Sequence, residues 1–268
     1  MKLPGLDKLG SVGFVGERKA VSLLCLGFYV TLFFMIGLSA RTELPEWVPV
    51  FVGMFLVYVT AFMGVAAEWF WGRWFATGLG YWGCTMAVMA FVTTRSFPTP
   101  MVVFGVMHAL TALCLQGEKM AAVFDAKPDW RVRWKLDEQG VLRVRRSVTR
   151  AASSLPALIM FALAPREGQG LSIAFDPASV ALLSVGALAL FGFLASQRTW
   201  ALMAFAGIGA LTVVRAMTPF TLYSGFDTTG WPDAGLMVHG AGAFAGAMLV
   251  AASLPFLAPM ARFLRHGR

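Results

Sequence analysis

The chain has 268 residues, of which 58% are hydrophobic and only 13% are charged, and it carries a net charge of +8. A soluble domain would have about 25% charged residues, so this composition excludes an ordinary soluble globular protein. No nucleic-acid recognition motif accompanies the positive charge, and nucleic-acid binding is not expected. The composition predicts an all-α protein that crosses a lipid bilayer several times.

Eight apolar runs predict a polytopic transmembrane helix bundle. The predicted spans are residues 21–40, 47–67, 74–94, 100–116, 151–165, 178–196, 199–215 and 236–258. The runs are uniformly apolar, whereas the strands of membrane barrels alternate, so we expect helices. The remaining segments are a tail at 1–20, a loop at 117–150 between the two sets of four spans (21–116 and 151–258), and a tail at 259–268.

Lys and Arg are distributed unequally over the predicted loops. Both tails and the loops after spans two, four and six contain eighteen of the 22 Lys and Arg residues. The other side contains only Arg41, Arg95, Arg166 and Arg215. Because cytoplasmic loops are enriched in Lys and Arg, we expect both termini in the cytoplasm and a multi-pass protein in the cell (inner) membrane.

The fifth span is short, because only fifteen residues separate Arg150 from Arg166. They would cover about 22 Å as a helix, against a hydrocarbon core of about 30 Å. A re-entrant segment is the alternative, and it would place the three C-terminal arginines outside. The distribution of positive charge therefore favours eight spans over seven.

The loop at 117–150 contains the most charged stretch of the chain. Apolar and basic residues alternate over 130–136, a turn-like Asp137–Gly140 follows, and a similar pattern resumes over 141–146. This arrangement predicts a cytoplasmic β-hairpin. Its candidate surface for anionic lipid head groups or a cytoplasmic protein consists of Trp130, Arg131, Arg133, Trp134, Lys135, Arg143, Arg145 and Arg146. A solvated loop that only fixes the topology is the alternative.

Four polar residues lie inside the predicted spans or at their ends. His108 is well inside span four, His239 is a turn into span eight, and Arg95 and Arg215 lie at the ends of spans three and seven. Polar groups at membrane depth are costly and usually face the bundle interior or a cavity. We therefore predict a ligand cavity containing these four residues. Histidines that merely hydrogen-bond a neighbouring helix are the alternative.

A weak internal repeat connects these positions. Arg, Trp and Gly-x-Gly open spans three and seven in the same order, Arg and Pro follow both spans, and His108 and His239 come next. A parallel repeat of two four-helix halves would place a site between them. The alternative is a chance likeness between apolar helices. Gly242 and Gly246 have the small-x-x-x-small spacing that predicts close helix packing.

The sequence contains no catalytic set, no metal-ligand spacing around Cys25, Cys84 and Cys114, and no motif that identifies a cofactor. The preferred interpretation is a small-solute transporter or permease-like protein with a site between the halves. One alternative is a non-catalytic membrane subunit or assembly factor whose basic loop docks a cytoplasmic partner or anionic lipid. The other is a membrane enzyme that acts on a lipid or isoprenoid. The oligomeric state is not predicted.

Overall fold

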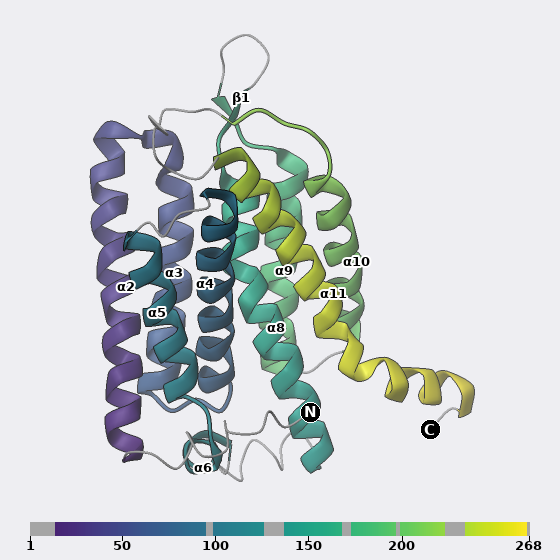
Figure 1. Ribbon diagram of the computed structural model, residues 1–268. Coiled ribbons are helices and arrows are strands. Elements are labelled where there is room, and N and C mark those ends of the chain that lie inside the picture. Colours follow the sequence, from purple (N-terminus) through teal and green to yellow (C-terminus); the bar gives the residue numbers. More distant parts are fainter. Residues whose placement is uncertain are drawn as a thin grey trace.

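The computed structural model describes residues 14–94, 99–125, 137–167, 173–196, 199–222 and 234–266, which form a helical bundle (Figure 1). Its helices are α2 (Val15–Glu43), α3 (Val48–Ala66, after the 3-10 turn η1, Pro45–Trp47), α4 (Gly72–Thr94), α5 (Thr99–Cys114), α6 (Glu118–Asp125), α8 (Glu138–Leu163), α9 (Pro177–Ser196), α10 (Thr199–Ala216) and α11 (Ala234–His266). The two-residue strands β1 (Arg166–Glu167) and β2 (Ile173–Ala174) pair antiparallel.

Successive long helices alternate in direction (Figure 1). Helices α2, α4, α8 and α10 run from the end of the bundle that carries α6 towards the end that carries β1, and α3, α5, α9 and α11 run back. We call these two ends the α6 end and the β1 end. The first turn of α2 and the last turn of α11 both lie at the α6 end.

Each of the eight predicted spans lies on a described helix. Five of these helices are long and apolar enough to cross a membrane, or six if α5 and α6, bent by 74° at their junction, form one broken span. Helix α8 is not among them because its first half is basic, and α10 is a shorter apolar helix. The fold is therefore all-helical, with several helices of the kind that multi-pass membrane proteins contain.

The outer surface of the bundle is apolar. Leu24 on α2, Phe191 on α9 and Met203 on α10 are 73%, 72% and 65% exposed. The interior is closed by large buried side chains such as Trp74 on α4 and Phe161 on α8. A soluble monomer rarely exposes apolar side chains over so many helices, so this surface is compatible with contact with lipid.

The predicted cytoplasmic hairpin is wrong in its second arm, because 138–150 is the first half of α8. The Asp137 carboxylate accepts a hydrogen bond of 2.6 Å from the Gly140 amide and caps this helix. Val141, Val144 and Val148 are buried at helical spacing. The alternation over 141–146 is too short to distinguish a strand from a helix, and the spacing to Val148 decides for the helix. The first arm lies outside the described residues.

The helix contacts divide the bundle into two halves with the same arrangement. In α2–α5, the first and third helices each pack on the second and the fourth. Helices α8–α11 repeat these four contacts in the same order. Helices α3 and α4 join the halves by packing on α8, while α4 touches α11 only lightly. The arrangement is compatible with the predicted parallel repeat, although any up-and-down four-helix bundle contains such a ring of contacts.

Glycines allow the third and fourth helices of each half to touch through their backbones. A Cβ atom on Gly80 of α4 would lie 2.8 Å from the carbonyl oxygen of His108, and one on Gly209 of α10 would lie 2.6 Å from that of Gly246. A Cβ atom on Gly242 would lie 2.5 Å from the Phe161 ring. The predicted close packing at Gly242 and Gly246 is confirmed.

Candidate functional site

His108, the deepest of the predicted cavity residues, lies in a dense aromatic cluster of the first half and is 2% exposed. Its Nδ1 donates to the carbonyl oxygen of Phe104 at 2.7 Å, which leaves Nε2 to accept from the Tyr58 hydroxyl at 2.5 Å. The ring centroid of Trp82 is 6.0 Å away. A Cβ atom on Gly83 would lie 2.0 Å from the imidazole. Both ring nitrogens are thus satisfied, Nδ1 by the backbone of α5 itself and Nε2 by Tyr58 of α3.

Arg215 and His239 belong to a different cluster, at the β1 end. The Asp176 carboxylate accepts hydrogen bonds from Arg215 Nε and Nη2, both at 3.0 Å, and from Arg166 Nη1 at 3.0 Å. The Arg166 guanidinium lies 4.0 Å from the Phe220 ring centroid, and Phe220 stacks on His239 at 4.1 Å. We call these five residues the Asp176 cluster.

The Asp176 cluster joins the segments that connect the helices at the β1 end. Arg166 pairs with Ala174 in the small sheet and forms an isolated bridge to Leu222. Burial alone raises the pKa of Asp176, but hydrogen bonds from Arg215 and Ser179 and the charge of Arg166 outweigh it and hold this pKa well below its ordinary value. The carboxylate is therefore ionised, and it balances one of the two arginines that approach it.

The four predicted cavity residues therefore do not form one group. Arg215 and His239 share the Asp176 cluster, His108 packs within the first half, and Arg95 lies outside the described residues. Gly80 lies against the carbonyl of His108 in the first half, and Gly209 lies against the carbonyl of Gly246 in the second half. In packing, His108 therefore corresponds to Gly246, which follows His239 by about two helical turns. The likeness between the histidines in the sequence is not a likeness in packing.

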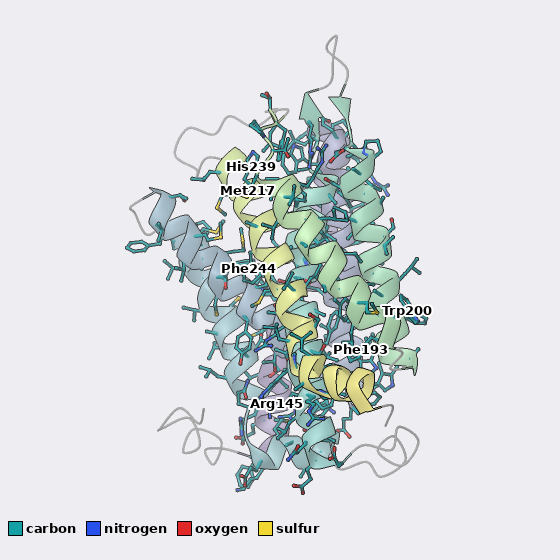
Figure 2. The ribbon with its side chains drawn as sticks, turned by 90° about the vertical axis from the view of Figure 1, so that its right-hand side faces the viewer. Arg145, Phe193, Trp200, Met217, His239 and Phe244 are labelled. Carbon is teal, nitrogen blue, oxygen red and sulfur yellow. The ribbon has the colours of Figure 1, made fainter. Side chains whose placement is uncertain are left out.

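The structure contains a pocket of about 270 Å³ at the α6 end, where α4, α8 and α11 meet. It is lined by Arg73, Trp74, Thr77 and Tyr81 of α4, Gln116 after α5, Arg145, Arg146, Thr149, Arg150 and Ser153 of α8, and Met248 of α11. Of the lining residues that the structure describes, four are arginines and none is Asp or Glu. Such a site attracts anions. We call it the arginine pocket, and it lies at the opposite end of the bundle from His239, as the position of Arg145 shows (Figure 2).

Two helix faces form most of the arginine pocket. Arg73, Thr77 and Tyr81 follow one another at intervals of four residues on α4 and so lie on one face. On α8, Arg146 and Arg150 are also four residues apart, and they lie on one face together with the lining residues around them. The two helices approach closely because α4 has Gly78 at their crossing, where a Cβ atom would lie 2.4 Å from the Thr149 carbonyl oxygen.

Arg73 is the only one of these four arginines with an ion pair to a described residue. It forms this pair with Asp125 of α6, is 2% exposed, and also donates to the Leu115 carbonyl at 3.3 Å. Arg145 is half-buried and donates to the Gln116 side-chain oxygen at 3.3 Å. Arg146 is exposed and forms no hydrogen bond with the other described residues. Within the described part of the chain, the positive charge of the pocket is therefore only partly compensated.

Arg150 connects the arginine pocket to a bend in α11. Pro255 has no N–H group, so the carbonyl of Ala251 has no partner within the helix. Arg150 Nη1 donates to this oxygen at 2.6 Å, and Ser147 Oγ donates to the Ala252 carbonyl, also at 2.6 Å. Figure 1 shows that α11 changes direction in its last third. Side chains of α8 thus bond two carbonyls of α11 just before the bend.

The sequence interpretation placed Arg145 and Arg146 on a loop surface and treated Arg73 and Arg150 as topology signals. A helical reading of 138–153 would have placed the lining residues of α8 on one face. Their meeting with α4 and with Met248 depends on helix crossings that no local pattern reveals. Of the predicted surface residues, Arg143 bonds Gln139 on α8 at 3.2 Å. The other predicted surface residues, Trp130, Arg131, Arg133, Trp134 and Lys135, lie outside the described residues.

The chain matches no protein-family model, no curated protein and no solved structure.

Proposed function

We propose that the chain crosses the cell (inner) membrane eight times, with the α6 end in the cytoplasm. The alternating directions of the eight long helices support this topology, because they bring the first turn of α2 and the last turn of α11 to the α6 end. The arginines that line the pocket are at the same end. Basic residues are retained on the cytoplasmic side of membrane proteins. The apolar half of α8, which is almost entirely buried, would cross between its neighbours, whereas the shorter α10 would face lipid on one side.

We further propose that the protein is a permease-like protein that takes an anionic substrate into the arginine pocket. The main observation is that four arginines, and no carboxylate among the described residues, line the pocket at the place where the first half meets the second. Permeases built from two halves bind their substrates between them. The guanidinium groups of Arg145 and Arg146 keep donors that suit phosphate or carboxylate oxygens.

The described conformation is compatible with a pocket that is closed towards the β1 end. Towards the β1 end, Met89 of α4 lies against Gly240 of α11, where a Cβ atom would be 2.1 Å from the Met89 methyl group. On the other side of α8, a Cβ atom on Gly53 of α3 would be 2.8 Å from Ile159. Apolar packing therefore closes the contact between the halves beyond the pocket.

Binding of inorganic phosphate to the purified full chain tests this proposal. We expect Arg145→Gln to weaken binding about tenfold, because a hydrogen bond from a charged group contributes about 1.5–3 kcal/mol. Arg143→Gln removes the same charge from the same helix but does not line the pocket, so it is the matched control. Equal losses in the two variants would mean that only net charge matters, and the proposed site would be wrong.

A further inference from the structure

The arginine pocket is continuous with the apolar outer surface of the bundle. Tyr81 on its edge is 44% exposed, and Val88 and Val92 continue the same face of α4 with exposures of 61% and 64%. On α11, Phe244 is half-buried one turn before Met248, which lines the pocket. The side chains next to the arginines are therefore ones that face lipid.

These side chains border the contact between α4 and α11, which is loose. Helices α4 and α11 both pack extensively on α8 but only lightly on each other. We call the strip between them the α4–α11 seam and define it by Tyr81, Val88, Phe244 and Met248. In Figure 2, Phe244 of α11 lies at a level between those of His239 and of Arg145 on α8. The seam thus leads from the arginine pocket towards the β1 end.

We infer that the anion in the arginine pocket is the phosphorylated head group of a membrane amphiphile, whose apolar chain lies along the α4–α11 seam. The inference rests on the proposed function and names its substrate class. In the proposed topology, the pocket lies at the depth of the head groups of the cytoplasmic leaflet. The seam runs from there towards the middle of the membrane, which is the direction that the acyl chains of this leaflet take.

The charge of the pocket favours a phosphate monoester over a carboxylate. Arg73 is balanced by Asp125, whereas Arg145, Arg146 and Arg150 have no ion pair with the described residues. A phosphate monoester carries about 1.5 to 2 negative charges and three acceptor oxygens, so it can engage two of these guanidinium groups at once. A single carboxylate would leave more of the positive charge uncompensated.

Three probes separate a lipid head group from a free phosphate. We would measure the binding of dioctanoyl phosphatidic acid, of glycerol 3-phosphate and of dioctanoylglycerol to the purified full chain in detergent. Phosphatidic acid should bind at least about tenfold more tightly than glycerol 3-phosphate, because chains held in the seam raise the effective concentration of the head group at the pocket. Dioctanoylglycerol, which lacks the phosphate, should not compete.

Variants assign the two parts of the ligand to the two parts of the site. Arg145→Gln should weaken both phosphate-bearing probes about tenfold, whereas Val88→Trp should weaken only phosphatidic acid. Leu211→Trp is the matched control for Val88→Trp, because Leu211 is 60% exposed on α10. Val88→Phe serves the same purpose if the Trp variant does not fold.

The outcomes distinguish this inference from the proposed function. If phosphatidic acid and glycerol 3-phosphate bind equally, or if Val88→Trp acts no differently from Leu211→Trp, the amphiphile is excluded while the anion pocket stands. If no phosphate-bearing probe responds to Arg145→Gln, both proposals are wrong.

Discussion

Asp176 holds together two arginines that would otherwise repel each other. The side chains of Asp176 and Arg166 are each 9% exposed, whereas that of Arg215 is 39% exposed. Removing one partner of a buried ion pair costs more than the pair itself contributes, because the other charge stays buried without compensation. The consequence of a substitution at Asp176 is therefore set mainly by Arg166.

We expect Asp176→Asn to lower the free energy of unfolding by about 3 kcal/mol, the lower end of the range for breaking a buried pair, because solvent screens Arg215. Thermal unfolding of the purified protein in detergent measures this loss. Glu43→Gln, at an exposed position at the end of α2, removes a carboxylate in the same way and should have little effect. Equal effects of the two variants would show that the Asp176 cluster does not stabilise the fold.

The pH dependence of this loss follows from the depressed pKa of Asp176. The contribution of such a carboxylate is fully present above its unfolded pKa of about 3.9 and disappears as pH falls through the lower folded pKa. The stability difference between wild type and Asp176→Asn should therefore be constant from about pH 8 to about pH 5. A difference that already narrows by pH 6 would contradict the assigned environment.

At the scale of helices, two features shape the bundle: close backbone crossings, one of them beside the arginine pocket, and the bend of α11. Gly78 brings α4 onto α8, and Gly209 brings α10 onto α11. Arg150 donates a hydrogen bond to the carbonyl of Ala251, which has no partner within the helix because Pro255 lacks an N–H group. Substitutions at these two features should have different effects on stability, because the crossings depend on the absence of a side chain and the bend depends on a hydrogen bond.

Gly209→Ala should destabilise the protein by about 1–3 kcal/mol, the usual cost of overpacking, because its Cβ atom would lie 2.6 Å from the Gly246 carbonyl oxygen. Gly207→Ala is the matched control on the same helix, since nothing lies within 4 Å of its Cβ position. It should be neutral or slightly stabilising. Thermal unfolding of both variants checks the difference, and a larger loss at Gly207 would contradict the packing of α10 on α11.

Arg150 and Pro255 should be coupled energetically. Arg150→Met leaves the Ala251 carbonyl unpaired and should cost about 1.5–3 kcal/mol. In a Pro255→Ala background, the restored N–H group can bond the same carbonyl, so the cost of Arg150→Met should fall by at least about 0.5 kcal/mol. Unfolding of the two single variants and the double variant gives the coupling. An equal cost in both backgrounds would mean that Arg150 does not support the bend.

At the scale of the whole molecule, the helices could be predicted from the sequence, but the sites could not. Apolar runs mark helices because backbone groups in lipid must pair within their own segment, so each predicted span lies on a helix. The prediction failed at Val141–Arg146, where a short alternation fits both a strand and a helix. It also failed for His108 and His239, because a shared motif does not fix the register in which helices pack.

The arginine pocket could not be predicted from the sequence for a related reason. Arg73 and Arg150 are separated by two whole predicted spans and a long loop, and both serve equally well as topology signals. They line one pocket because Gly78 lets α4 approach Thr149 of α8. A glycine of this kind cannot be distinguished in the sequence from the other glycines of an apolar helix.

The accessibility of the two ends of the bundle tests the central claim most directly. In a chain whose Cys25, Cys84 and Cys114 are replaced by Ala, single cysteines would be introduced at Glu138, exposed at the α6 end, and at Met217, which is 78% exposed at the β1 end (Figure 2). We predict that a membrane-impermeant maleimide labels Met217→Cys in intact cells and Glu138→Cys only after permeabilisation. Labelling of both from the same side, or of Glu138→Cys alone in intact cells, would contradict a bundle that spans the membrane with its basic end in the cytoplasm.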